Sequence, residues 1–264
     1  MVEVFSSGGG TQSNCIASLI IQGKLPKPDL VVIADTGREC GTTWEYLNAV
    51  TMPALAGVGV EIHRVRCDEW GGHYANEPNW LDPSGKTMIL PTWTDETGSV
   101  GKMPGFCSSK WKNRVIQSFL SKTFGLTRSK VRMWIGFSMD ETRRALRMMA
   151  GPDWDKGLIR FPMIHDVPMR RHHGIREVEN MGWPKPPRSR CWMCPNQADD
   201  EWRDLKENAP EEFAKAVEFE REIQEFDPCA WLHRSCTPLD EVDFSKEPTL
   251  FDSGGYCSSG MCFV

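Results

Sequence analysis

Short apolar runs alternate with segments of helical periodicity along the chain, and this alternation limits the folds open to it. Strands are predicted at residues 3–5, 29–37, 60–67, 131–138 and 158–164, and the run at 29–37 is continuously apolar, as expected of a buried parallel strand. Segments with apolar residues at helical spacing lie between them, at residues 14–24, 42–55, 111–124 and 140–150. Strands and helices that alternate in this way build a mostly parallel sheet with helices on both faces. We therefore predict an α/β, Rossmann-like fold with a mostly parallel five-stranded sheet.

The composition of the chain changes after Pro187, which predicts two regions. Residues 1–187 form the predicted α/β core, in which residues 68–104, rich in Gly, Pro, Trp and Asp, suggest a long loop or flap. Residues 188–264 begin with a Cys-x-x-Cys turn, continue through an acidic helical pair at 199–226 and end in a cysteine-containing tail. A chain of 264 residues with 40% hydrophobic content is long enough for both regions.

Charge is distributed unevenly along the chain. The net charge is −5, but residues 110–190 hold 18 Lys and Arg against 7 Asp and Glu, so this middle segment carries +11 and the remainder −16. A basic segment in an acidic protein predicts an anionic partner, here nucleic acid and DNA in particular. The alternative is a solvated surface whose cations pair with the acidic tail.

Compartment and membrane association can be predicted from the same sequence. It has no apolar run of about 18 residues, so we expect no membrane span and no membrane partner. The N-terminus lacks a basic stretch followed by an apolar one, which predicts a cytoplasmic protein. The ten cysteines then suggest thiols or metal ligands rather than a disulfide framework.

The stretch FSSGGGTQSN at residues 5–14 joins the first predicted strand to the first predicted helix. Glycines at such a junction let backbone N–H groups point at a phosphate, and the helix N-terminus adds a partial positive charge. The stretch has neither the Lys of a Walker A motif nor the G-x-G-x-x-G spacing of a dinucleotide fold, and a plain turn is the alternative. The predicted nucleotide- and phosphate-binding residues here are Ser7, Gly8, Gly9, Gly10, Gln12 and Ser13.

Polar residues also follow two other predicted strands, in the segments DTGRE and SMDETRR, and we expect them to join the glycine stretch in one site. Asp35 is a candidate to bind a ribose hydroxyl, hold Mg²⁺, or act as a base or nucleophile. Asp140 and Glu141 are the other candidate catalytic carboxylates, with a simple helix cap as the alternative. The remaining predicted nucleotide- or phosphate-binding residues are Gly37, Lys112, Arg143 and Arg144.

Cys191 and Cys194 have the spacing of a metal-binding knuckle, in which two thiolates on one tight turn face the same ion. A redox pair is the alternative. Such pairs normally open a helix after a strand, whereas this one follows a proline-rich stretch and precedes a proline.

Six motifs in order resemble those of the phosphoadenosine-phosphosulfate reductase-like family, within the adenine-nucleotide α-hydrolase superfamily. The motifs are SSGGGTQS with LVVIADTGRE, GFCSSKWK, IGFSMDETRR, RFPMI, MRRHH and SRCWMCPNQADDEW. The similarity covers residues 4 to about 222 and is closest to the versions that bacteriophages carry. It implies a nucleotide-binding α/β fold and a bacterial or phage-infected cell as the setting.

The resemblance also implies the rest of a metal site. Cys107 is a family position and His173 aligns with a family cysteine, which gives the implied set Cys107, His173, Cys191 and Cys194. A Cys3His set suits zinc and, less commonly, a [4Fe–4S] cluster. Competing ligands are His172, Cys229 and Cys236.

Two departures from the family bear on the chemistry. Members that split ATP into AMP and pyrophosphate carry Ser-Gly-Gly-x-Asp-Ser, and here Gln12 stands in place of that Asp after an extra glycine. The reductases use a mobile cysteine near the C-terminus, but Cys257 and Cys262 have a different spacing and context. Sulfonucleotide reduction is therefore disfavoured.

Aromatic residues lie among the cations of the basic middle segment, as they do in grooves that grip unstacked bases. Most of these aromatics are expected in the core, and Trp183 is the best candidate for an exposed one. The predicted nucleic-acid-binding residues are Arg170, Arg171, Trp183, Lys185 and Arg188.

Three functions remain open from the sequence. The first is an ATP-dependent enzyme, with ATP and Mg²⁺ at the glycine stretch, that forms AMP and pyrophosphate while it activates a nucleobase or a small group. The second is a DNA glycosylase-type hydrolase that excises a modified base from phage DNA without ATP, using Asp35, Asp140 or Glu141. The third is a non-catalytic nucleotide- or nucleic-acid-binding module.

Overall fold

The computed structural model describes residues 1–245, which fall into two compact units. The first unit comprises residues 1–72 and 113–189, and the second comprises residues 73–112 and those from 190 onward. The predicted boundary after residue 187 lies two residues from the observed one. Most of the predicted flap packs within the second unit instead of extending from the α/β core, because its strands and turns pair with the C-terminal segment.

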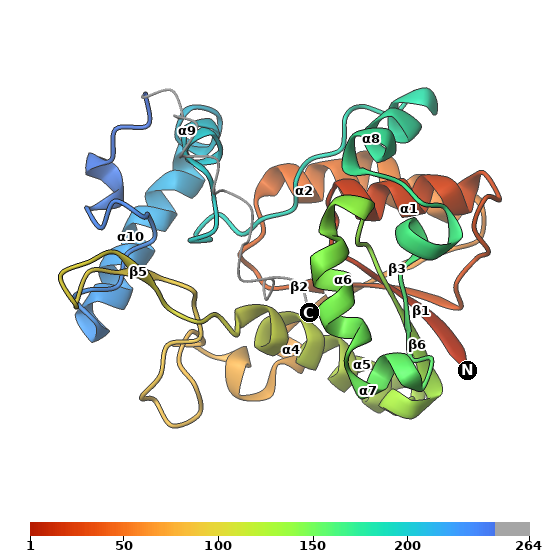
Figure 1. Ribbon diagram of the computed structural model, residues 1–264, viewed down its shortest axis with the longest axis horizontal. Helices are drawn as coiled ribbons and strands as arrows, with labels where there is room; N and C mark the ends of the chain where they lie inside the picture. The colour runs from red at the N-terminus through yellow and green to blue at the C-terminus, as the bar shows by residue number, and fades with distance from the viewer. Residues whose placement is uncertain (246–264) are drawn as a thin grey trace. The chain divides into compact units, whose positions relative to one another are not determined.

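The first unit is built on a parallel sheet in the order β3-β2-β1-β6-β7 (Figure 1). Its strands are β1 (Val2–Ser7), β2 (Leu30–Asp35), β3 (Ile62–Arg66), β6 (Val131–Ile135) and β7 (Ile159–Arg160). All four neighbouring pairs are parallel, with Phe5 opposite Val31 on one side and Trp134 on the other. The predicted five-stranded parallel sheet is confirmed.

The helices of this unit occupy the segments between the strands. They are α1 (Thr11–Ile21), α2 (Gly41–Tyr46), α3 (Met52–Gly57), α4 (Cys67–Trp70), α5 (Arg114–Phe124), α6 (Thr142–Met149), α7 (Pro152–Asp155) and α8 (Arg171–Asn180). Single helical turns of other types lie at Leu47–Thr51, Arg128–Lys130, Met139–Glu141 and Pro162–Asp166, and Ser108–Asn113 leads into α5. The last strand is shorter than predicted, because Pro162 has no N–H to extend the ladder and starts a helical turn.

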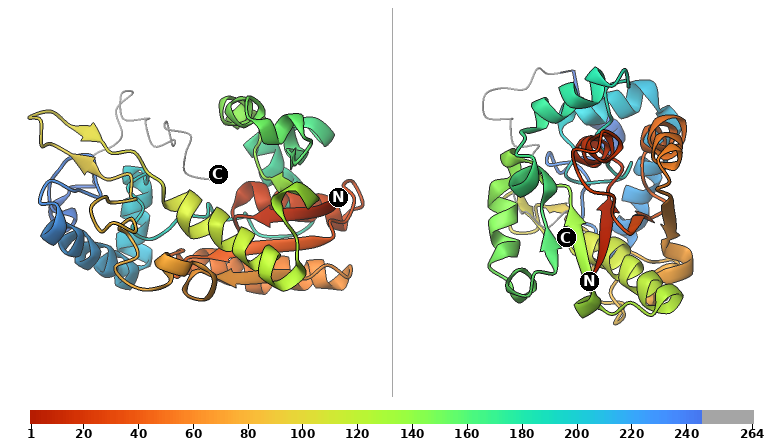
Figure 2. Two further views of the ribbon diagram at one scale, coloured as in Figure 1. Left: turned by 90° about the horizontal axis from the view of Figure 1, so that it is seen from below. Right: turned by 90° about the vertical axis from the view of Figure 1, so that its right-hand side faces the viewer.

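Alternation of side chains along the strands explains why helices cover both faces. Phe5, Val31 and Ile33 point to one face, where they form a core cluster with apolar residues of α1 and α8. Val4 and Val32 point the other way and are fully buried. The buried stripe of α5 packs on β2 and β3. Figure 2 shows α1 and α5 on opposite sides of the strands.

The second unit combines a short hairpin with two acidic helices. The hairpin strands are β4 (Trp93–Thr94) and β5 (Gly101–Lys102), and the helices are α9 (Asp199–Asn208) and α10 (Pro210–Phe226), with 3₁₀ turns at Gly72–Ala75 and Leu239–Glu241. The acidic helical pair predicted at 199–226 is confirmed. Trp93 pairs in antiparallel fashion with Trp231. Among the described residues, no helix is long and apolar enough to cross a membrane.

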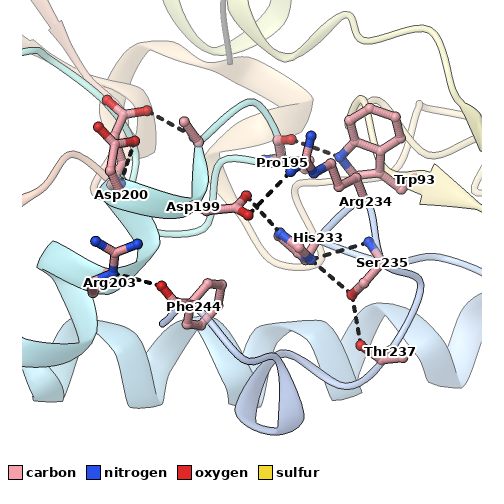
Figure 3. Close-up of polar contacts among 12 residues, drawn as sticks. Trp93, Pro195, Asp199, Asp200, Arg203, His233, Arg234, Ser235, Thr237 and Phe244 are labelled. Carbon is pink, nitrogen blue, oxygen red and sulfur yellow. Dashed lines mark hydrogen bonds and ion pairs between the residues drawn. The ribbon is translucent and has the colours of Figure 1, made fainter. Parts of the chain in front are cut away.

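Buried polar side chains hold residues 231–244 in place. Glu220, only 2% exposed, accepts the backbone N–H groups of Leu232 and Leu239 at 2.8 and 2.7 Å. His233 lies between Asp199 and Ser235 (Figure 3): Nε2 is 3.2 Å from an oxygen of Asp199, and Nδ1 is 2.8 Å from Ser235 Oγ. Because Nδ1 also accepts the Ser235 N–H at 3.2 Å, the proton sits on Nε2 and is donated to Asp199. This network holds residues 231–244 against α9.

Candidate functional site

The strand order marks one end of the sheet as the place for a ligand. β1 is central, and the chain adds β2 and β3 on one side of it, then β6 and β7 on the other. In such sheets ligands bind at the carboxyl ends of the strands where the order reverses. The segments that follow β1 and β6 are therefore the structural centre of the candidate site.

The glycine stretch after β1 is braced by its own side chains. Gly8 N–H donates to Ser13 Oγ at 2.8 Å and Gly9 N–H to Ser7 Oγ at 3.2 Å. Asn14, fully buried, donates from Nδ2 to the Gly9 carbonyl at 3.0 Å and accepts from the Thr51 hydroxyl at 2.7 Å. Asn14 was not among the predicted site residues, and its signal was a polar residue on the buried side of an apolar helix.

Two of the three glycines are required by neighbouring protein atoms. Gly9 has φ +72°, and a Cβ there would lie 2.8 Å from Thr43 Cγ2 and 3.0 Å from Leu47 Cδ1. A Cβ on Gly10 would lie 2.8 Å from the backbone nitrogen of Ser189. Packing alone thus requires glycine at positions 9 and 10, and their role in binding a phosphate stays a prediction.

Gly8 and the start of α1 remain open to a ligand. The nearest atom to a Cβ on Gly8 would be Ser13 Oγ, at 3.7 Å. Within residues 1–245, no side chain caps the N-terminus of α1, and its first turn contains no acidic residue. The first N–H groups of a helix have no partner within the helix, and with the helix dipole they favour an anion. The role of Gly8 and Gln12 in binding a phosphate stays a prediction.

The segment after β6 meets the start of α1 through Glu141. Gln12 Nε2 donates to Glu141 Oε2 at 2.7 Å, and the other oxygen of Glu141 pairs with Arg144. The Arg144 guanidinium also lies over the Phe137 ring, 4.4 Å from its centre. The structure brings Gln12, Glu141 and Arg144 together as predicted for one site, and their role in binding a nucleotide stays a prediction.

Asp35, at the end of β2, is buried and already held by two partners. One oxygen accepts the Gly37 N–H at 2.8 Å, and the other pairs with Arg64 at 2.8 and 2.6 Å. Arg64 lies over the Trp44 ring, 4.0 Å from its centre. The sequence analysis missed this pair. Its signal was a cation on the strand that neighbours β2, where Arg64 and Arg66 both occur.

Asp140 lies just before α6, but its side chain caps the start of α8. One of its oxygens accepts the backbone N–H of Arg171 at 2.6 Å, at the first residue of α8. The neighbouring Met139 N–H donates to the carbonyl of Met169 at 2.8 Å. These bonds join the start of α6 to the start of α8 and give Asp140 a structural role.

The proline-rich segment 184–189 runs along the glycine stretch. Thr11 Oγ1 donates to the Pro187 carbonyl at 3.3 Å, and Ser189 Oγ donates to Glu39 at 3.0 Å. Of the residues predicted to bind nucleic acid, Arg170 and Lys185 are exposed, while Arg171, Trp183 and Arg188 are half-buried. Trp183 packs against the core cluster, so less of its ring is available to a base than predicted.

The predicted metal ligands are divided between the units. Cys107, Cys191 and Cys194 belong to the second unit, and His173 lies on α8 in the first. Burial, with a smaller contribution from Cys194, raises the pKa of Cys107 to about 12. Residues 1–245 contain no group of three or more His, Cys, Asp or Glu side chains arranged to hold a metal ion. The Cys3His set stays a prediction.

Two other predictions have no counterpart in the described site. Lys112 belongs to the second unit, so its place at the phosphate site stays a prediction. Cys257 and Cys262 lie outside the described residues.

Comparison with known proteins gives a distant likeness. No protein-family model matches the chain, and no curated protein sequence is found to resemble it. Among solved structures, the U34-tRNA thiolase NcsA from Methanococcus maripaludis with its [4Fe-4S] cluster is similar at 13% identity and a TM-score of 0.43. The match covers 99% of this chain and 80% of that one. A likeness at this level does not bear on the chemistry of the site.

Proposed function

We propose that the protein is a nucleotide-dependent enzyme acting on nucleic acid, which binds ATP at the carboxyl ends of β1 and β6 and forms AMP and pyrophosphate. The observation that carries the proposal is the contact between Gln12 and Glu141 at the point where the strand order reverses. It joins the uncapped start of α1, which favours phosphate, to the Glu141–Arg144 pair from the other half of the sheet.

The side chains have separable roles in this proposal. The first N–H groups of α1 hold phosphate oxygens beside Gly8, where no protein atom lies close to the position of a Cβ, and Mg²⁺ would bind with the nucleotide. Glu141 and Phe137 fix the direction of Arg144, whose guanidinium neutralises charge that develops on the phosphates. Gln12 contributes an amide in place of the family's carboxylate.

The glycosylase alternative has less support, because it needs a carboxylate that can stabilise a developing sugar cation or position a water. Asp35 is paired with Arg64, Asp140 accepts the N–H of Arg171, and Glu141 is shared between Gln12 and Arg144. Each of the three candidates already has a structural partner. The basic charge of residues 110–190 supports a nucleic-acid substrate in either case.

Product analysis by mass spectrometry tests the proposal. The protein is incubated with ATP and Mg²⁺, with single-stranded DNA or RNA, and with both. We expect AMP and pyrophosphate in amounts that depend on the nucleic acid, and a large loss in an Arg144→Gln variant but not in Lys130→Gln. A free base released without ATP would support the glycosylase instead, and the absence of any product would leave only a binding module.

A further inference from the structure

We propose that an exposed face, formed by α6 and the start of α8, binds the sugar–phosphate backbone of a single-stranded nucleic acid. This α6–α8 face comprises Met139, Arg143, Leu146, Arg147, Arg170, His172 and His173. The inference rests on the proposed function in one respect, since the strand bound here is the substrate of the neighbouring site.

The geometry of α6 puts a basic stripe on its outer side. Arg143, Leu146 and Arg147 occupy positions i, i+3 and i+4 of the helix and are all exposed, while Ala145 is buried against the unit. Arg143 and Arg147 are separated by about 6 Å along the helix axis, at 1.5 Å per residue. Two guanidinium groups on one side of a helix can therefore contact neighbouring phosphates of one strand.

The start of α8 extends this face. Asp140 accepts the Arg171 N–H at 2.6 Å and Met139 N–H bonds to the Met169 carbonyl at 2.8 Å, so the first residues of the two helices lie together. Arg170, His172 and His173 are exposed there, and the two imidazole rings lie 4.0 Å apart. From these contacts we infer that the exposed Arg residues of both helices lie on one surface.

Positive charge predominates on this surface. Residues 142–151 and 167–176 contain six Arg and two His, and neither Asp nor Glu. The acids that adjoin these segments in sequence all have partners. Asp140 accepts the Arg171 N–H, and Glu141 is held by Arg144 and Gln12. Asp166 pairs with Arg160, and Glu177 pairs with Lys24. The positive charge comes from Arg side chains, and a guanidinium can bind a phosphate through two parallel hydrogen bonds.

The exposed apolar residues favour a nucleic acid over a lipid surface. Met139 and Leu146 are 41% and 56% exposed and lie among the cations, where they can contact sugars or bases. A helix that lies on a bilayer presents a continuous apolar face, and the eight residues of α6 offer a single exposed Leu. An unpaired strand is favoured over a duplex because a base must leave its stack to reach the site that Glu141 and Gln12 form.

Fluorescence anisotropy with a labelled single-stranded 20-mer, at 50 to 200 mM NaCl, tests the inference. The test variant is Arg143→Gln/Arg147→Gln. The control is Lys130→Gln/Lys156→Gln, which removes the same charge from exposed residues just before β6 and β7, at the opposite end of the sheet. Melting temperatures establish that both variants fold. Vesicles containing anionic phospholipid replace the oligonucleotide in a parallel series.

We expect the test variant to bind at least tenfold more weakly at 50 mM salt. Its slope of log affinity against log salt should be shallower by about 1.4, because each lost phosphate contact of a single strand contributes about 0.7. The control should keep the wild-type slope. Equal losses in both variants, or wild-type binding to vesicles but not to the oligonucleotide, would overturn the inference.

A parallel titration of the wild type with ATP separates this inference from the proposed function. A protein that binds ATP but no oligonucleotide contradicts the α6–α8 face and leaves the nucleotide site standing. Oligonucleotide binding that depends on Arg143 and Arg147, without any ATP binding, supports the face and contradicts the proposed function.

Discussion

Three adjacent glycines in this protein have different physical reasons to be glycine. Gly9 needs a positive φ and space beside Thr43, Gly10 needs space beside the Ser189 backbone, and Gly8 needs neither. A run of glycines in the sequence cannot distinguish these cases, because the neighbours come from 30 to 180 residues away. The glycine stretch was predicted from the sequence, but its division between packing and binding was not.

Alanine substitutions at the three positions should separate packing from binding. We expect Gly9→Ala and Gly10→Ala to lower the free energy of unfolding by about 1–3 kcal/mol, since each added methyl meets protein atoms within 3 Å. Gly8→Ala should melt within error of the wild type. Thermal denaturation followed by circular dichroism measures all three, and equal melting temperatures across the set would contradict the packing account.

His233 should make stability depend on pH. Burial lowers its pKa below the usual 6.5, although Asp199 opposes this effect. The unfolded chain therefore binds a proton more readily than the folded one, so stability is full above pH 6.5 and falls as the pH drops toward the lowered pKa. We expect the melting temperature to fall over that interval.

Two matched variants test whether His233 causes this dependence of stability on pH. His233→Asn should melt lower at pH 7.5 but lose much of the pH dependence just below 6.5. His172→Asn, at an exposed histidine, should keep it. If the two variants show the same pH profile, the buried imidazole is not the cause.

At the scale of elements, Asp140 couples two helices that are far apart in sequence. Replacing it by Ala removes the acceptor for the Arg171 N–H, and loss of such a cap costs about 1 kcal/mol. Hydrogen–deuterium exchange at residues 170–174 should become faster in Asp140→Ala and remain close to the wild type in Asp140→Asn, which keeps an acceptor oxygen. Unchanged exchange in both variants would show that the bond does not hold the start of α8.

The five strands and most helices could be predicted because each is defined by local periodicity. The predictions were wrong where the structure of a segment depends on residues far away in the sequence or on a proline. Residues 68–104 look like a flap because Gly and Pro break their periodicity, yet Trp93 pairs with Trp231, well over a hundred residues away. The last strand was predicted too long because the apolar residues at 161–164 continue past a proline that ends the ladder.

At the scale of the whole molecule, the sequence predicted that the segments after β1 and β6 meet, because parallel strands bring their carboxyl ends together, and Gln12 and Glu141 do so. It could not identify which charged groups are already paired. The partner of Asp35 comes from another strand, and that of Asp140 from another helix. Such pairings depend on the register between strands and on where helices pack, and local sequence patterns predict neither.

The central claim is a nucleotide site between Gly8 and Gln12, and calorimetric titration with ATP and Mg²⁺ tests it most directly. The proteins to compare are the wild type, Gly8→Asp, and Gly57→Asp as a control at an exposed glycine with open space around it. We predict that the wild type and the control bind ATP alike, and that the Gly8 carboxylate weakens binding at least tenfold by repelling phosphate. Equal affinity in all three proteins, or no binding by the wild type, would contradict the account.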